Sequence, residues 1–414
     1  MRDLRAQATP WRRVRAEGRG QLPRRCRGRH AHLGTVDGCD QDVKTILLGA
    51  SNSWFPISLS ALSIPTRGDE LDQRIAARWA VLEKIPSLDV LRYALDTDVQ
   101  LAGLKEHTPE ELFDAIERRR AGVEDDPATD LRLPEWEVFS NPTGAPDTDD
   151  FRLRVVPSPA RYAGVISEVV LAEKLREVIA LTGFTRVEAP YDLGANGQQV
   201  AAAPMARQDP RWVPCTEVRG EGLFLRFHVD ALDAWEQRYR DSGRAQSLFA
   251  AHRQWRLRRG LPVDSWQGWP GVRFVVLHSL SHALIRELSL ECGYGASSIR
   301  ERIYSARPDA PDMAGILLYT AAPDSEGTLG GLVSLGEPEL LGRLLTQALE
   351  RARLCSSDPL CSEHEAAGDA VHHAACHSCQ FASETSCERG NRFLDRAAIV
   401  DTFGVAGAAL FPGA

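Results

Sequence analysis

The sequence predicts a mixed α/β protein with a mostly helical N-terminal half and an α/β C-terminal half. Apolar residues recur at helical spacing over residues 70–122, whereas strand-like and helix-like segments alternate from residue 151 onward. Five of the nine cysteines lie between Cys355 and Cys387, so the C-terminal half is expected to end in a cysteine-rich segment. The 414 residues suffice for two or three domains of roughly 150 residues each.

The distribution of charge along the chain limits the classes of function that the protein can have. The chain has 49 Lys+Arg against 57 Asp+Glu, a net charge of −8, yet residues 1–29 alone carry ten arginines against Asp3 and Glu17. The rest of the chain is therefore strongly acidic, which excludes a uniformly basic nucleic-acid-binding protein. Any contact with DNA would have to come from a local patch or through a partner.

Four regions are expected along the chain. Residues 1–40 read as a basic disordered tail or a truncated upstream region, and residues 41–150 as a mostly helical region. Residues 151–270 read as an α/β middle region, and residues 271–414 as a C-terminal domain. No apolar run is long enough to cross a bilayer and no secretory signal is visible, which predicts a cytoplasmic protein without a membrane span.

The first elements follow from local pattern. The run Thr45–Pro65 suits a buried, irregular strand-and-turn segment, and residues 70–86 and 88–103 have helical spacing. Thr108, Pro109 and Glu111 form a capping box that starts a third helix, expected to run to about Gly122. A linker is expected over residues 123–150.

The middle region should hold a helix over Val165–Leu181, a strand from Gly222 and a helix over residues 231–240. A basic and tryptophan-rich stretch follows. Its arginines could grip phosphate beside stacking aromatic faces, or they could form a solvated face over packed tryptophans. The residues concerned are Arg253, Arg256, Arg258 and Arg259, with Trp255, Trp266 and Trp269.

The last region should begin with one long helix from Val272 to about Gly293. A strand over Gly315–Thr320, a glycine-rich loop over Asp324–Gly331 and a helix over Glu337–Leu354 should follow. The loop could bind phosphate or make a tight packing turn. It lacks the G-K-[ST] sequence of a P-loop, which excludes an ATPase of that type.

The cysteine spacing after this helix predicts zinc. A C-x2-C pair places two thiolates on one turn, and a second pair completes a tetrahedral shell, so we expect a closed structural site. Four ligands are needed and five are available, which makes Cys387 a spare or a substitute for Cys361. The candidates are Cys355, Cys361, Cys376, Cys379 and Cys387.

Catalytic motifs are weak. His278 and His282 lie one helical turn apart and could share a metal, but a metalloprotease needs Glu at position 279, which is Ser, so two packed histidines are the alternative. A zinc deaminase needs Pro where Ala375 stands. No nucleophile elbow is present, and we therefore do not expect an enzyme.

Several ordered segments carry a family resemblance. They are LHSLSHALIRELSLECGY, GILLYTAAPDSEGTLGGL, ARLCSSDPLC, AACHSCQ and TSCERGNRFLDRA, preceded by LLGASNSWFPISLSALSIP and LREVIALTGFTRVEAP. Together they resemble the DrmB family of the bacterial antiphage DISARM systems over residues 45–400. The end of the chain is similar to the MrfA-like zinc-binding domain that closes many superfamily 2 DNA helicases.

The resemblance implies a non-catalytic subunit that pairs with a separate helicase to bind DNA in antiphage defence. It also implies structural zinc on the cysteines named above, and it places the start of the chain short of the family's longer N-terminal region. Two rival functions remain. One is a hydrolase or nuclease that uses His278, His282, Asp324 and Glu326, and the other is an interaction scaffold without DNA contact.

Overall fold

The computed structural model describes most of the chain, with gaps. The described residues are 29–30, 33–36, 54–65, 74–105, 107–120, 131–185, 203, 205–208, 212–258, 261, 263, 268–305, 312–320, 331–368, 370–383 and 385–413. The glycine-rich loop predicted over Asp324–Gly331 lies outside them except for its last residue, which begins α10 (Gly331–Ser334).

The predicted helices of the first half form a cluster with its own core. It contains α3 (Trp79–Leu82), α4 (Leu88–Thr97), the 3-10 helix η3 (Val99–Leu104) and α5 (Pro109–Arg120). Apolar residues spaced at helical intervals, such as Leu91 and Leu95 on α4, are buried in that core. The capping box is confirmed, because the Glu111 backbone donates to Thr108 Oγ1 at 3.3 Å and Glu111 accepts from the Thr108 backbone at 3.2 Å.

A six-stranded sheet follows, in the order β3-β5-β6-β8-β7 with β4 paired to β5. The strands are β3 (Phe55–Leu62), β4 (Arg152–Val156), β5 (Ile166–Thr185), β6 (Cys215–Phe227), β7 (Ile299–Ser305) and β8 (Ala314–Thr320). The pairs β4–β5, β6–β8 and β7–β8 are antiparallel, so the mixed α/β class is confirmed. A separate short hairpin joins β1 (Arg29–His30) to β2 (Thr35–Val36).

Two predicted elements are wrong. The helix expected over Val165–Leu181 is the strand β5, because both of its faces are covered: Val169 and Leu171 enter one apolar cluster, while Val170 and Ala172 enter another. A run buried on both sides loses the alternation that marks a strand. The linker expected over residues 123–150 contains the helix α6 (Arg132–Ser140).

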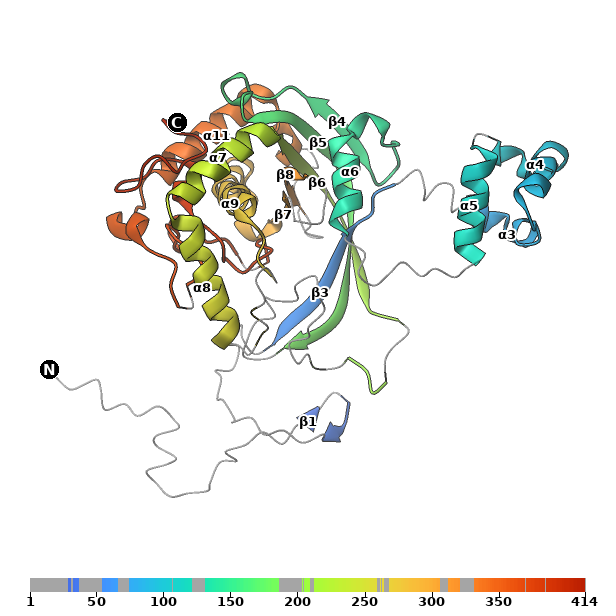
Figure 1. Cartoon of the computed structure of the whole chain (residues 1–414), viewed down its shortest axis with the longest axis horizontal. Coiled ribbons are helices and arrows are strands. Elements are labelled where there is room, and N and C mark those ends of the chain that lie inside the picture. Colours follow the sequence, from blue (N-terminus) through green and yellow to red (C-terminus); the bar gives the residue numbers. More distant parts are fainter. Residues whose placement is uncertain are drawn as a thin grey trace. The chain divides into compact units, whose positions relative to one another are not determined.

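The largest apolar cluster lies between the sheet and the C-terminal helices. These are α7 (Val229–Asp241), α8 (Arg244–Arg258), α9 (Val272–Cys292), α11 (Pro338–Ala352) and α12 (Arg396–Ile399). The long helix α9 is confirmed and ends at Gly293, whose φ of 72° only glycine adopts freely. It packs against α11, α12, β7 and β8, and Figure 1 shows α9 beside β7 and β8.

Burial of α9 on nearly all sides sets the environment of the candidate site. Its polar residues Ser279, Ser281, His278 and His282 are enclosed together with its leucines. None of the helices in the described part of the chain is long and apolar enough to span a membrane.

Candidate metal centres

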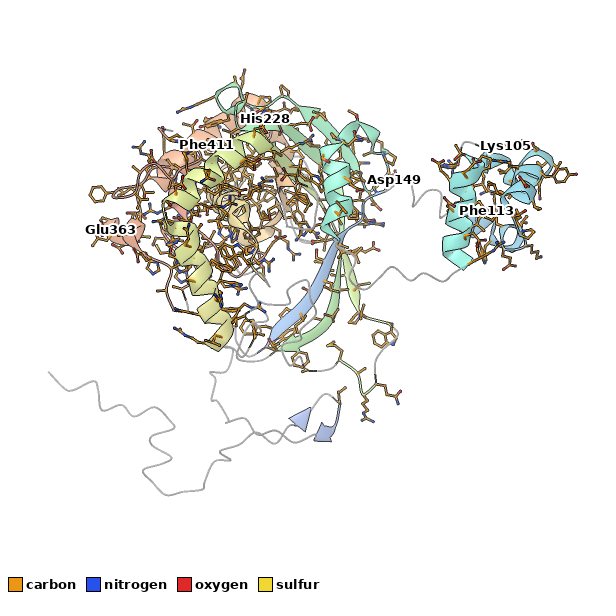
Figure 2. All side chains as sticks on the ribbon, in the orientation of Figure 1. Lys105, Phe113, Asp149, His228, Glu363 and Phe411 are labelled. Atoms are coloured by element: carbon orange, nitrogen blue, oxygen red, sulfur yellow. The ribbon has the colours of Figure 1, made fainter. Side chains whose placement is uncertain are left out.

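Four of the five candidate cysteines meet at one point. Cys355 follows the end of α11, Cys361 lies on the 3-10 helix η7 (Pro359–Glu363), and Cys376 and Cys379 share one turn. In that turn the backbone N–H groups of Cys379 and Gln380 donate to the Cys376 carbonyl, at 3.2 and 3.0 Å. Figure 2 shows Glu363, the last residue of η7, projecting outward beside this segment. We call Cys355, Cys361, Cys376 and Cys379 the four-cysteine cluster.

The sulfur spacing of the four-cysteine cluster fits zinc. The Sγ atoms of Cys376 and Cys355 are 3.6 Å apart, and those of Cys379 lie 3.7 Å from both Cys361 and Cys376. A tetrahedral ion with bonds of about 2.3 Å places its sulfur ligands about 3.8 Å apart. All four sulfur atoms lie within 4.8 Å of one another. Two disulfides would not require all four sulfurs to be this close.

The electrostatics of the four-cysteine cluster also favour a cation. Burial raises the pKa of Cys361 to about 11 and holds that of Cys379 well above its ordinary value. At Cys376 burial acts upward too, but hydrogen bonds from the Ser378 and Cys379 backbone and from the Cys355 and Cys379 thiols together outweigh it, and the pKa is lowered. Four thiolates in this volume therefore need a compensating positive charge, which a bound zinc ion supplies.

The fifth cysteine belongs to a different group. Cys387 lies with His278, His282 and Glu301, and the four ligand atoms again fall within 4.8 Å of one another. All four residues are buried. We call them the histidine cluster. Its members come from α9, from β7 and from the loop that precedes α12.

Distances within the histidine cluster are short. His278 Nε2 lies 3.1 Å from Cys387 Sγ and 3.0 Å from Glu301 Oε1. His282 Nε2 lies 3.4 Å from the same Glu301 oxygen, and its Nδ1 faces the Gln380 carbonyl at 2.7 Å. The two imidazole rings stand nearly perpendicular, with centroids 4.4 Å apart.

Charge in the histidine cluster is strongly coupled. Burial disfavours protonation of the imidazoles, but the negative charges of Glu301 and Cys387 together outweigh it, raising the pKa of His278 to about 9 and that of His282 well above its usual range. The same histidines hold the pKa of Glu301 far below its ordinary value. They also lower the pKa of Cys387 to about 7, against the effect of burial. Without a metal, the cluster is a network of ion pairs.

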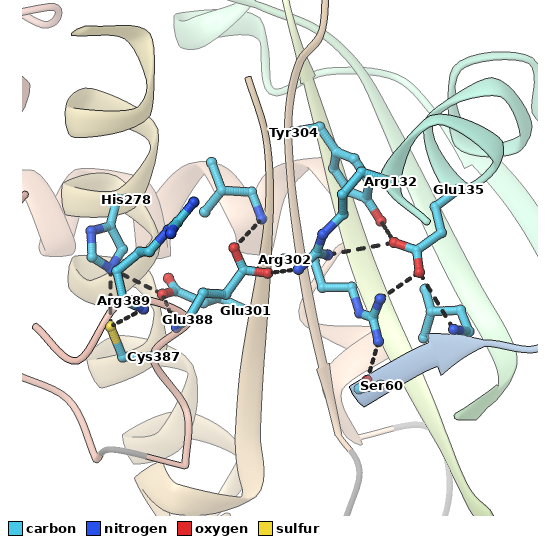
Figure 3. Close-up of polar contacts among 12 residues, drawn as sticks. Ser60, Arg132, Glu135, His278, Glu301, Arg302, Tyr304, Cys387, Glu388 and Arg389 are labelled. Atoms are coloured by element: carbon cyan, nitrogen blue, oxygen red, sulfur yellow. Dashed lines mark hydrogen bonds and ion pairs between the residues drawn. The ribbon is translucent and has the colours of Figure 1, made fainter. Parts of the chain in front are cut away.

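A second buried polar network lies on the other face of β7. Arg302 pairs with Glu135 of α6 and, at 3.2 Å, with Glu177 of β5. Tyr304 donates to Glu135 at 2.9 Å. Figure 3 shows Glu301 near His278 and Cys387, and Arg302 near Glu135 and Ser60. Neighbouring residues of one strand thus serve two different polar groups.

The arginines proposed to contact DNA do not form one surface. Arg253 and Arg258 are exposed on α8, Arg256 is buried, and Arg259 lies outside the described residues. Trp255 is buried with the Arg392 guanidinium 4.2 Å from its ring centre, as the interpretation with packed tryptophans expects. Trp266 lies outside the described residues, and Trp269 is partly buried against Phe249 and Phe393.

The residues of the rival hydrolase are not brought together by the described part of the chain. Asp324 and Glu326 lie outside it, and the carboxylate that lies beside His278 and His282 is Glu301. Sequence reasoning missed Glu301 because its strand, with the sequence IRERIYS, has three consecutive charged residues, as a solvent-exposed segment would. Its burial depends on partners that are distant in sequence.

Comparisons with known proteins agree with the geometry. Residues 280–380 match the MrfA Zn-binding domain family, a range that contains the four-cysteine cluster but not Cys387. A solved structure, the DUF1998 helicase MrfA bound to DNA, is similar over 59% of this chain and 25% of its own, at 11% identity and a TM-score of 0.26, too low to support an argument.

A curated relative extends the similarity beyond that domain. The DISARM protein DrmB of Bacillus paralicheniformis is 32% identical over 390 residues, which cover 91% of this chain and 68% of the relative. Identity at this level, over nearly the whole chain and most of the relative, establishes a common family. The chain belongs to the DrmB family of DISARM proteins and carries a zinc-binding domain near its C-terminus.

Proposed function

We propose that the chain is a non-catalytic, zinc-binding subunit that works with a separate helicase on DNA in bacterial antiphage defence. The observation that carries this proposal is the 32% identity to a DISARM DrmB protein over 91% of the chain. The match to a zinc-binding domain named after MrfA adds support for association with helicases. A cytoplasmic location fits the free thiols of the described cysteines.

In this proposal zinc has a structural role. Cys355, Cys361, Cys376 and Cys379 would hold it, and four protein ligands leave no coordination position for water. The ion would supply positive charge that allows four thiolates to lie within 4.8 Å of one another. The cysteines would thereby fix residues 355–379, a segment with few regular elements, against the end of α11.

DNA contact is assigned to a small part of α8. Arg253 and Arg258 are the two exposed members of the predicted group, and Arg256 is set aside because it is buried. Two arginines add little affinity on an acidic protein. They would act together with a helicase that binds most of the DNA.

The test is salt-dependent DNA binding by the chain with its helicase partner, comparing wild type with Arg253→Ala/Arg258→Ala. Each lost phosphate contact should reduce the slope of log affinity against log salt by roughly 0.9, so the double variant should lose up to about 1.8. Arg161→Ala/Arg343→Ala removes the same charge from two other exposed arginines and should leave the slope unchanged.

Two results would contradict this function. DNA affinity without salt dependence, or equal slopes for both double variants, would remove α8 from the interface and favour a scaffold that does not touch DNA. Turnover of nucleic acid by the purified chain, abolished by His282→Ala, would instead identify a hydrolase.

A further inference from the structure

The histidine cluster has the chemistry of a metal site that is separate from the four-cysteine cluster. Its donors are two imidazole nitrogens, one carboxylate oxygen and one sulfur, all within 4.8 Å of one another and all buried. These are the ligand types that zinc takes in proteins. We propose that His278, His282, Glu301 and Cys387 bind a second zinc ion.

The three elements direct their donors to one place. His278 and His282 are four residues apart on α9 and therefore project from the same side of the helix. Glu301 reaches them from β7, at 3.0 and 3.4 Å from their Nε2 atoms. Cys387 approaches from the loop before α12, at 3.1 Å from His278 Nε2. Both histidine Nε2 atoms therefore approach the same oxygen, Glu301 Oε1, which is more than a single hydrogen-bonded pair requires.

Neighbouring groups orient these donors as they do around known metal sites. His282 donates from Nδ1 to the Gln380 carbonyl at 2.7 Å, which leaves the Nε2 lone pair directed at the cluster. That Nε2 is buried and has no hydrogen-bond partner. The Cys387 sulfur accepts from the backbone N–H groups of Arg389 and Asn391, at 3.4 and 3.2 Å, an arrangement suited to a thiolate.

Charge balance points to a divalent cation. Histidines that ligate a metal are neutral, so in the metal-bound cluster the carboxylate and the thiolate leave two negative charges in a buried volume. A divalent ion cancels that charge, and zinc accepts a mixed nitrogen, oxygen and sulfur shell. Ser281 donates to the second oxygen of Glu301 and fixes the carboxylate in place.

A catalytic Cys-His-Glu arrangement does not fit the same atoms. In such a triad the base uses one ring nitrogen for the nucleophile and the other for the carboxylate. Here Cys387 Sγ and Glu301 Oε1 both approach His278 Nε2, and His278 Nδ1 is buried without a hydrogen-bond partner. The sulfur is also buried, which leaves a substrate no approach.

The second site would join parts of the chain that the first does not. It would tie α9 and β7 to the loop at Cys387, whereas the four-cysteine cluster lies within residues 355–379. Gln380 connects the two, because its carbonyl accepts from His282 and its chain neighbour is Cys379. The histidine cluster is thus well placed to hold the loop at Cys387, which follows the four-cysteine cluster in the chain, against α9 and β7.

Zinc stoichiometry of the purified full-length chain tests the proposal. We expect two zinc ions per wild-type chain and one in His282→Gln/Cys387→Ser. Cys376→Ser/Cys379→Ser should also retain one zinc ion, the one in the histidine cluster, so that the loss of each site is measured separately. His107→Gln/Cys215→Ser makes the same kinds of substitution outside both clusters and should keep two.

X-ray absorption at the zinc edge gives a second readout on wild type, independent of whether any variant folds. Two sites give five sulfur ligands among eight, whereas the four-cysteine site alone gives only sulfur. One zinc ion per folded wild-type chain, or a zinc shell made of sulfur alone, would overturn the proposal. The histidine cluster would then be a network of ion pairs between protonated histidines, Glu301 and Cys387.

Discussion

The four-cysteine cluster and the histidine cluster differ in how their members are distributed along the chain. The first draws on a single segment, residues 355–379, and two of its members share one turn. The second joins α9, β7 and a loop, and His278 and Cys387 are 109 positions apart in the sequence. Its environment is also different, because all four of its members are buried while Cys376 and Cys379 are partly exposed.

That difference explains what each cluster can do for the fold. A local cluster closes a short loop and orders a segment that has few regular elements. A cluster built from distant elements fixes the packing of a helix, a strand and a loop, and it forms only after those elements have packed. Loss of the first should therefore disturb one segment, and loss of the second should disturb the centre of the domain.

Of the three stability changes predicted below, the largest is expected from removing the four-cysteine cluster. Cys376→Ser/Cys379→Ser should lower the free energy of unfolding by about 4 kcal/mol, the contribution of a ligand present at roughly 1,000 times its dissociation constant. Urea unfolding with parallel zinc analysis measures both quantities. The control Cys215→Ser/Cys292→Ser changes two cysteines outside both clusters and should retain full zinc content. A metal-free variant with the same free energy of unfolding as wild type would contradict a structural role for the zinc ion.

A metal-independent reference comes from Asp395, which accepts two bonds from Arg244 at 2.7 and 2.9 Å. Burial acts to raise the pKa of Asp395, but Arg244 outweighs it and the folded-state pKa is lowered. Its stabilisation is therefore full above the unfolded-state pKa of about 4 and is lost as pH falls through the folded-state pKa. Asp395→Asn should cost roughly 2 kcal/mol at pH 7.

The gap between Asp395→Asn and wild type should narrow as pH falls below about 4. Acid releases zinc from both proteins alike, so the difference isolates the ion pair from the metal clusters. Urea unfolding from pH 7 to pH 3 measures it, and Asp147→Asn, at an exposed pair with Arg152, should show almost no gap. A gap that is constant with pH would disprove the assignment.

The smallest effect is expected in the helical cluster of the first half, which contains no residue of either metal cluster. Thr108→Ala removes the cap of α5 and should cost about 1 kcal/mol within the helical cluster, with zinc content unchanged. Hydrogen exchange of the α5 amides measures the local change. Thr97→Ala removes a hydroxyl that donates to the Tyr93 carbonyl within the same helix and should change α4 much less. Loss of zinc in Thr108→Ala would contradict independence of the two regions.

Sequence reasoning succeeded where the determinants are local. The capping box at Thr108, the helix α9 with its stop at Gly293 and the C-x2-C turn all depend on residues a few positions apart. The place of Cys387 was left open, as a spare or as a substitute for Cys361, because it depends on residues distant in sequence. Spacing allowed it beside the other cysteines, and only the packing of α9 against β7 places it with the histidines.

The same physical limit explains the errors in the fold. β5 was predicted as a helix because burial on both faces removes the alternation of a strand. The histidine pair was recognised as four residues apart, but its carboxylate partner was sought in the loop at Asp324 instead of at Glu301. Partners of a buried charge are chosen by the tertiary fold, which local patterns do not encode.

The alternation of Glu301 and Arg302 has a consequence for how β7 aligns with β8. In an apolar strand, a slip by one residue exchanges one hydrophobic side chain for another of similar size. In β7, paired as Glu301 with Leu318 and Arg302 with Leu317, a slip would drive a guanidinium toward two histidines and a carboxylate toward Glu135 and Glu177. Opposite charges on the two faces of β7 therefore favour a single register with β8.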